Sequence, residues 1–471
     1  MIIKSNRNTA VKVYLPWIAA LAFFMQSLDG TILNTALPAI AKDLQQSPLQ
    51  MQSVIISYTL TLAILIPVSG WLADKFGTKV TFSIAVGLFT IGSLCCALSS
   101  DINQLIYSRI LQGIGGAMMV PVARLTILYA YPKKLLLKVL NFVIIPGMIG
   151  PLVGPSLGGW IVELASWHWI FLINIPIGIF GIVMATFAMP NFKRNTGAFD
   201  FLGFIFFSGA LTLITLSMEM NSSNQVRTVY ILMLFVIALA FIYFYIKHAK
   251  RREKPLINLE LFKIRTLRIG LIGSLATRLG IGGFPLLLPL MLQVGFGYSA
   301  AVSGMMLIPS AAANLFAKPF VTKVVRKLGY KKVLVSNTLL LAVIISLFSL
   351  PNQHTPVYYL IPLLLAYGMV SSMQFSSMNT ISVADLDRET SSEGNSMIAV
   401  TQQLSISFGI SITSLLLGMM NQIHFRTDAA INTFKYTFLI LGIITALSSI
   451  VFARLKKTDG NNLSGHRELE S

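Results

Sequence analysis

The sequence is poor in charged residues. Asp, Glu, Lys and Arg make up 11% of its 471 residues, whereas about 25% is usual in soluble globular domains. Hydrophobic residues account for 55% of the chain. So few charges cannot cover the water-facing surface of a chain of this length, which excludes an ordinary soluble protein.

Cysteine, histidine and nucleotide-binding motifs are scarce or missing as well. Cys95 and Cys96 are adjacent inside an apolar run, a spacing that suits neither a disulfide framework nor a zinc site. None of the five histidines lies in the middle of an apolar run, which argues against a histidine proton relay. The sequence has no phosphate-binding Gly-Lys-Ser/Thr loop and no zincin or Ser-His-Asp pattern. We therefore expect no enzyme activity, no cofactor and no metal site.

The chain has many long apolar runs instead. A transmembrane helix needs about 20 predominantly apolar residues, and these runs are too long and alternate too little for the strands of a membrane barrel. We predict an all-α integral membrane protein with 14 transmembrane helices. The expected spans lie near residues 14–37, 52–72, 79–98, 104–128, 138–163, 169–189, 201–220, 228–247, 266–293, 299–321, 331–350, 357–380, 395–419 and 434–454.

Basic residues outnumber acidic ones by 36 to 17, which gives a formal net charge of +19. In a soluble protein this excess would suggest a nucleic-acid partner. Here the basic residues cluster in short loops beside the expected spans, so we expect no nucleic acid. With 14 spans, 28 of the 36 fall on the side that holds both termini, four on the opposite side and four inside spans. The positive-inside rule then predicts that both termini are cytoplasmic.

One loop motif occurs twice. Residues 70–79, GWLADKFGTK, follow the second span, and residues 322–332, TKVVRKLGYKK, follow the tenth. Alignment of Gly77 with Gly329 also matches a lysine on either side, although Arg326 replaces the aspartate of the first copy. The chain therefore has a 6+2+6 arrangement of spans. The expected domains are an N-terminal six-helix bundle (1–190), two inserted transmembrane helices (191–247), a cytoplasmic basic linker (248–265), a C-terminal six-helix bundle (266–457) and a short cytoplasmic tail (458–471).

Several further motifs accompany the repeated loop. They are LDGTILNTALP at 28–38, LIYSRILQGIGGA at 105–117, GPLVGPSLGG at 150–159 and WHWIFLINIPIG at 167–178. Together with the loop they resemble the major facilitator superfamily, specifically its 14-span drug:proton antiporter branch, over nearly the whole chain. The resemblance implies a proton-coupled secondary active exporter of small molecules that works by alternating access between two helical bundles. It also implies protons, a small-molecule substrate and the lipid bilayer as partners, and a functional monomer.

The most informative charged residues are Asp29 in the first span and Arg109 in the fourth. An ionisable side chain inside a span is costly and marks a functional site by default. We predict that Asp29 couples transport to protons and that Arg109 tunes it or relays the proton, whereas fixed structural hydrogen bonds remain the alternative for both. Polar residues on the same helices, Gln26, Asn34 and Gln112, are candidates to line a cavity.

The resemblance assigns two further sets of residues. In the loop after the second span, Gly70, Asp74, Lys75, Gly77 and Lys79 are expected to form a conformational latch, although topology signalling by the lysines alone is an alternative. In the fifth span, small residues at helical spacing allow close helix approach, and the resemblance assigns them to an antiporter motif. The expected members of that motif are Gly150, Gly154, Pro155, Gly158 and Gly159.

Two other functions stay open. An exporter of narrow specificity for a metabolite, a siderophore or a metal–organic-acid complex would carry the same motifs. Arg278 in the ninth span is a candidate cavity residue that would favour an anionic substrate. A non-transporting membrane sensor or accessory protein is the second alternative, and it predicts no proton-coupled flux.

Overall fold

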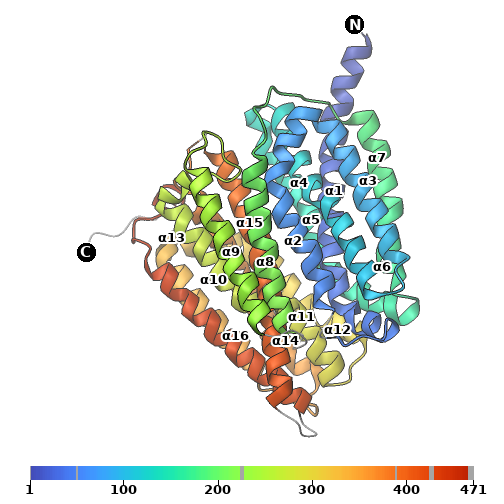
Figure 1. Ribbon diagram of the computed structural model, residues 1–471, viewed down its shortest axis with the longest axis vertical. Helices are drawn as coiled ribbons and strands as arrows, with labels where there is room; N and C mark the ends of the chain where they lie inside the picture. Colours follow the sequence, from blue (N-terminus) through green and yellow to red (C-terminus); the bar gives the residue numbers. More distant parts are fainter. Residues whose placement is uncertain (1, 49–50, 223–227, 388–389, 424–428, 465–471) are drawn as a thin grey trace. The chain divides into compact units, whose positions relative to one another are not determined.

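The computed structural model describes residues 2–48, 51–222, 228–387, 390–423 and 429–464 (Figure 1). The expected tail, 458–471, is therefore described only as far as Ser464. Within the described ranges the chain is helical and has no strand. Its helices form two compact units. Unit 1 comprises Met1–Asp200 and Ser299–Met305, and unit 2 comprises Phe201–Tyr298 and Met306–Ser471.

Unit 1 holds the first six spans and one short helix from later in the chain. The sixth span consists of two helices, α6 and α7, that meet at Ile173. The short helix, α12, packs against α5. The helices of unit 1 are α1 (Ile2–Asp43), α2 (Gln52–Phe76), α3 (Thr78–Ala97), α4 (Ile102–Ala130), α5 (Lys133–Leu164), α6 (His168–Leu172), α7 (Asn174–Ala188) and α12 (Ala300–Met305).

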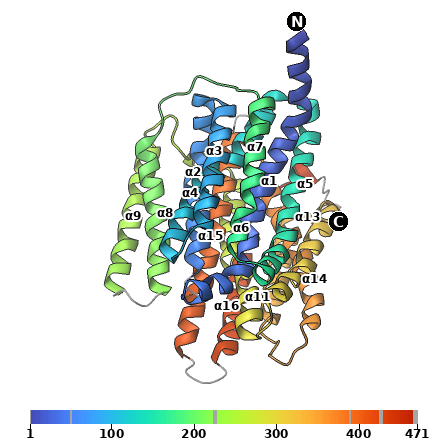
Figure 2. The ribbon, with the colours of Figure 1, turned by 90° about the vertical axis from the view of Figure 1, so that its right-hand side faces the viewer.

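Unit 2 holds the other helices, including the two inserted ones. The inserted pair, α8 and α9, pack side by side through Phe206, which contacts Phe241 and Phe244 (Figure 2). The α-helices of unit 2 are α8 (Phe201–Ser222), α9 (Thr228–Ala249), α10 (Arg265–Ile281), α11 (Phe284–Leu290), α13 (Ile308–Leu347), α14 (Leu360–Val383), α15 (Ser391–Ile423), α16 (Ala429–Ala453) and α17 (Asn461–Ser464). Three single-turn helices of other types are η2 (Leu259–Lys263), η3 (Met291–Gly295) and η4 (Val357–Tyr359).

Thirteen helical segments of the described chain are long and apolar enough to cross a membrane. One of them, Ala300–Leu347, has 48 residues, which at about 1.5 Å per residue is more than twice the thickness of the hydrocarbon core. It is interrupted at Gly329, whose φ of 75° and ψ of 157° are not helical. Division at Gly329 gives 14 spans, so the predicted all-α membrane fold with a 6+2+6 arrangement is confirmed.

The ninth span, expected near 266–293, is confirmed as one apolar segment, Arg265–Gly295, but it is not a single continuous helix. The structure breaks it into α10, α11 and a π-helical turn, η3. The first break lies at Gly282 and Gly283, where an added Cβ on Gly282 would meet the backbone of Gly409 in α15 at 3.3 Å. Because α10 and α15 approach so closely, these positions have no room for a side chain. The glycine pair therefore combines a close helix contact with a break in the helix.

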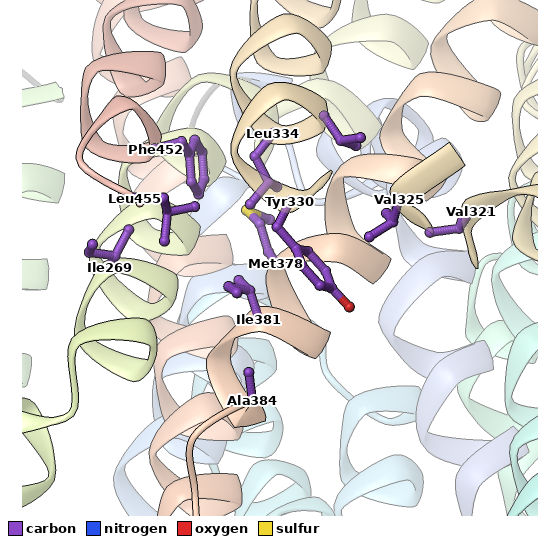
Figure 3. Close-up of a cluster of buried hydrophobic side chains, with 11 residues drawn as sticks. Ile269, Val321, Val325, Tyr330, Leu334, Met378, Ile381, Ala384, Phe452 and Leu455 are labelled. Atoms are coloured by element: carbon purple, nitrogen blue, oxygen red, sulfur yellow. The ribbon is translucent and has the colours of Figure 1, made fainter. Parts of the chain in front are cut away.

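An apolar cluster ties together the ends of four helices of unit 2. Tyr330 of α13 meets Met378 and Ile381 of α14, while Phe452 of α16 and Ile269 of α10 complete the cluster (Figure 3). All five side chains are buried. Tyr330 directly follows Gly329, so the repeated loop of unit 2 is fixed on a packed base.

Candidate functional site

The structure brings Asp29 of α1 and Arg109 of α4 together inside unit 1. Arg109 Nη1 lies 2.7 Å from Asp29 Oδ2, and both side chains are 1% exposed. The sequence left this contact open, because residues 80 positions apart cannot be paired by spacing. A short hydrogen bond between ionised groups is of the strong, charge-assisted kind.

Gln112, one turn after Arg109 on α4, holds both members of the pair. Its Nε2 donates to Asp29 Oδ1 at 2.8 Å and to Ser93 Oγ of α3 at 2.7 Å. Its Oε1 accepts from Arg109 Nη1 at 2.6 Å. Asn174, the first residue of α7, adds a weaker bond from Nδ2 to Asp29 Oδ1 at 3.3 Å. The amide side chains therefore cross-link α1, α3, α4 and α7 around one carboxylate.

Aromatic rings and one carbonyl complete the surroundings of Arg109. Its guanidinium carbon lies 4.2 Å from the ring centre of Tyr58 in α2 and 5.9 Å from that of Phe171 in α6. Its Nε donates to the Val54 carbonyl of α2 at 3.3 Å. A cation over aromatic faces is stabilised when it is shielded from water. Residues of α2 and α6 therefore hold Arg109, whereas residues of α3 and α7 help to hold Asp29.

The hydrogen-bond pattern favours an ionised carboxylate. Arg109, Gln112 and Asn174 all donate to the two oxygens of Asp29, and a carboxyl proton would need an acceptor instead. Protonation would therefore remove the ion pair and disturb the amide bonds at the same time. In this structure the two oxygens of the buried Asp29 carboxylate are satisfied by donors from α4 and α7.

The α2–α3 turn holds the second set of expected residues. Asp74 Oδ1 accepts from the Tyr129 hydroxyl of α4 at 3.0 Å, and the Lys75 ammonium lies 4.4 Å from the Trp71 ring centre. Gly77, with φ of 103°, adopts a backbone conformation that favours glycine. An added Cβ at Gly70, in contrast, would meet nothing within 4 Å, so nothing in the packing requires glycine there.

The small residues of α5 face two helices of unit 1. Gly150, Gly154 and Gly158 lie so close to α1 that an added Cβ would overlap α1 atoms. Two α1 hydroxyls use this approach, because Thr31 Oγ1 donates to the Gly150 carbonyl at 3.3 Å and Thr35 Oγ1 donates to the Pro155 carbonyl at 2.8 Å.

The other face of α5 contacts α12. An added Cβ at Gly159 would overlap the backbone of Ala300, and one at Gly304 would overlap the backbone of Pro155. Ser156 Oγ donates to the Gly304 carbonyl at 3.1 Å. The expected antiporter motif is therefore a double helix-packing surface.

The remaining candidates lie apart from the ion pair. Asn34 is buried and Gln26 is half-buried on α1, but in the described part of the chain neither makes a hydrogen bond to the Asp29 cluster. Arg278 belongs to α10 of unit 2, where its Nε donates to Ser274 Oγ at 3.3 Å. Its guanidinium carbon lies 4.2 Å from the Phe375 ring centre.

Sequence reasoning missed Ser93, Tyr58 and Asn174 as members of the site. Asn174 could have been suspected, because it is a lone amide inside the apolar run 170–177 of a family motif. Ser93 and Tyr58 carry no such signal, since both residue types are ordinary in packed transmembrane helices. Their roles depend on which helices lie beside α4, which only the fold reveals.

The membrane-spanning fold and its buried ion pair define a multi-pass α-helical transporter. Residues 19–410 match the family described as Major Facilitator Superfamily. The chain is 45% identical over 450 residues to the putative multidrug resistance protein MdtD of Enterobacter sp. (strain 638), with 95% of each chain covered. It is 46% identical over 450 residues to the protein of that name from Salmonella heidelberg (strain SL476), covering 95% of this chain and 96% of the relative.

Solved structures show the same fold. A crystal structure of a bacterial homologue of the human lysosomal transporter Spinster aligns with a TM-score of 0.66 at 11% identity, and the alignment covers 94% of this chain and 96% of that one. The chain belongs to the major facilitator superfamily and is a transporter of that family.

The ion pair predicts a non-additive effect on stability. Arg109→Gln leaves the Asp29 carboxylate buried without its cation, a loss of about 3–5 kcal/mol for this class of change. Asp29→Asn with Arg109→Gln should recover part of that loss, because no charge then remains unpaired. Thermal unfolding of the purified full-length protein in detergent measures both.

The matched control is the exposed pair Glu260–Lys263, whose side chains are about three-quarters exposed. Glu260→Gln should change stability by less than about 1 kcal/mol. If the stability losses of the single variants Asp29→Asn and Arg109→Gln simply add up in the double variant, the two residues do not stabilise each other.

Proposed function

We propose that the protein is a proton-coupled exporter of small molecules, a drug:proton antiporter that works by alternating access. The observation that supports this most directly is the fully buried Asp29–Arg109 pair. An ion pair in a span contributes little as a plain stabilising device, because desolvation offsets most of its attraction. Its presence suits a group that changes charge during a cycle.

The proposed cycle uses the two states of Asp29. With the carboxylate ionised, three donors face its oxygens and Arg109 is neutralised. Protonation from the outer side removes this attraction and leaves Arg109 with Gln112 Oε1, the Val54 carbonyl and the Tyr58 ring. The six helices that meet at the site then favour a different packing, and release of the proton to the cytoplasm restores the original packing.

Two other features support a moving rather than a static bundle. At the glycines of α5 this helix approaches α1 and α12 closely, and small residues at a helix contact suit a helix that shifts against its neighbours. The α2–α3 turn, with Asp74 held by Tyr129, is proposed as the conformational latch. Lys75 and Lys79 contribute the positive charges that mark a cytoplasmic loop.

The proton gradient supplies enough energy for useful export. One charge crossing about 100 mV yields about 2.3 kcal/mol, and one pH unit adds about 1.4 kcal/mol. Together they sustain a substrate gradient of roughly a few hundred-fold per proton.

We also propose that the termini are cytoplasmic and that the membrane is the bacterial inner membrane. The excess of Lys and Arg on the side of the termini supports this orientation. A cysteine placed at the exposed Lys332 position should react with an impermeant maleimide only in inside-out vesicles. Labelling in intact cells would show that this loop, and with it the termini, faces the outside.

Antiport is tested in energised inside-out vesicles with a panel of lipophilic cations and organic anions. A transported compound should release protons from the vesicles with the wild type, and Asp29→Asn should abolish the release because its side chain cannot ionise. A pH-sensitive dye measures the pH of the vesicle lumen.

Asp101→Asn is the control, since this exposed carboxylate caps α4 by accepting from two backbone amides and asparagine preserves the cap. Undiminished release by Asp29→Asn would remove Asp29 from the coupling. A wild type that is silent with every compound would favour the non-transporting alternative.

Arg278 favours a second candidate, an exporter of narrow specificity for an anionic metabolite, siderophore or metal–organic-acid complex. In the described residues no carboxylate lies within ion-pair distance of this arginine, whose side chain contacts Ser274 and the Phe375 ring. An arginine inside a span with no counter-charge suits an anionic ligand. The relatives named for multidrug resistance support the broader drug-export proposal instead.

The same vesicles separate the two candidates. If the substrate is an anion, Arg278→Gln should lower proton release by an organic anion at least tenfold, whereas Arg268→Gln, at an exposed position of the same helix, should not. Release that responds only to lipophilic cations and is unchanged in Arg278→Gln would rule out the anionic candidate.

A further inference from the structure

The segment that follows α7 does not leave unit 1 at once. It runs as non-helical chain across the ends of α2 and α3 (Figure 1). Thr78, the first residue of α3, donates from its backbone N–H to the Phe192 carbonyl at 3.0 Å and from Oγ1 to the Pro190 carbonyl at 2.9 Å. The Phe192 N–H donates back to Thr78 Oγ1 at 3.0 Å. Three hydrogen bonds therefore join one residue of the turn to this segment.

Asn191 fills the space that Gly77 leaves open. Its Oδ1 accepts from the Lys79 N–H at 3.1 Å, and an added Cβ on Gly77 would overlap the Asn191 amide. The first turn of a helix has backbone N–H groups without partners in the helix, and Asn191 supplies an acceptor for one of them from outside α3. The glycine of the repeated loop is thus also a docking position for this side chain.

Arg194 holds Asp74 from two directions. Its backbone N–H donates to the Asp74 carbonyl at 2.9 Å. Its guanidinium carbon lies 3.9 Å from the ring centre of Tyr129, whose hydroxyl donates to Asp74 Oδ1. Stacking on the ring fixes the plane of Tyr129, so Arg194 orients the donor that holds the Asp74 carboxylate.

The segment after α7 makes further contacts with α2 as far as Phe199. Trp71 Nε1 donates to the Gly197 carbonyl at 3.0 Å, and its ring centre lies 4.9 Å from that of Phe199. Asp200 is the last residue of this part of unit 1, and α8 begins at Phe201. No free linker separates the bonded segment from the first inserted helix.

Unit 2 has a similar arrangement, in which the chain after the last span packs beside the repeated loop. After its last span, Gly460, with φ of 78°, lies against Tyr330 and Ile381 of the apolar cluster. Asn462 Nδ2 donates to the Ala384 carbonyl at the end of α14 at 2.7 Å. Tyr330 adjoins Gly329, the counterpart of Gly77. In each unit the chain after the last family span returns to the repeated loop, so the docking in unit 1 is part of a repeated design.

We propose that residues 190–200 form a strap that holds the α2–α3 turn of unit 1 in place, with Asn191 and Arg194 as its positioning residues. Phe201, the first residue of the inserted helix α8, directly follows the strap in the chain, so α8 is covalently joined to the segment that is bonded to Thr78, Lys79 and Asp74. The inference deepens the proposed function, since it rests on the α2–α3 turn acting as the latch of the transport cycle.

Hydrogen–deuterium exchange of the full-length protein in lipid nanodiscs tests the strap without a substrate. Asn191→Ala removes the acceptor of the Lys79 amide, and exchange of the peptide covering 74–81 should rise about tenfold, as expected for one lost hydrogen bond. Asn191→Asp keeps an acceptor oxygen and should restore protection. Arg194→Ala should also raise exchange, whereas Lys193→Ala removes the same charge from an exposed neighbour and should not.

A Gly-Ser-Gly-Ser insertion between Asp200 and Phe201 tests the link to α8. It leaves every strap residue in place but slackens the connection, so the turn should again exchange faster. Unchanged exchange at 74–81 in Asn191→Ala, or in the insertion variant, would overturn the proposal.

Proton release in inside-out vesicles then connects the strap to transport. Variants that loosen the turn should release protons at least several-fold more slowly while their thermal unfolding stays close to that of the wild type. Normal release from a loosened turn would contradict the strap's role in transport. A wild type that releases no protons would count against the proposed function alone, since the exchange result stands independently.

Discussion

The structure of unit 1 depends on one constraint: a carboxylate inside a membrane span must have partners. Asp29 obtains them from Arg109 and Gln112 of α4 and from Asn174 of α7, and Ser93 of α3 anchors Gln112 in turn. Because Arg109 is itself held by a carbonyl and a ring of α2, a single charge organises five helices. A change of that charge therefore acts on the packing of the whole unit.

The α1 helix carries two different kinds of contact on its faces. Asp29 faces a polar network with defined partners, whereas Thr31 and Thr35 face the glycines of α5, where the two helices approach closely. In the proposed cycle the first contact changes with the charge of Asp29, and the second is the surface along which α1 and α5 shift. One helix then joins the proposed charge switch to the proposed moving surface of alternating access.

Much of the fold could be predicted from the sequence because transmembrane helices depend on local apolar length and on basic loops. The break at Gly329 followed from its alignment with Gly77. The break at Gly282 and Gly283 did not, since it depends on contact with Gly409 of α15. Likewise Asp29 and Arg109 were found as costly charges, but Ser93, Tyr58, Asn191 and Arg194 gain their importance only from neighbours that are distant in sequence. Spacing cannot reveal such contacts.

The central claim is that Asp29 takes up and releases a proton in place. Infrared difference spectra of the protein in lipid, recorded between acidic and neutral pH, report protonated carboxyl groups in apolar surroundings directly. The account predicts a carboxyl C=O band in the wild type that disappears in Asp29→Asn and persists in Asp101→Asn. An identical band in wild type and Asp29→Asn would contradict it, because the buried pair would then be a fixed structural contact.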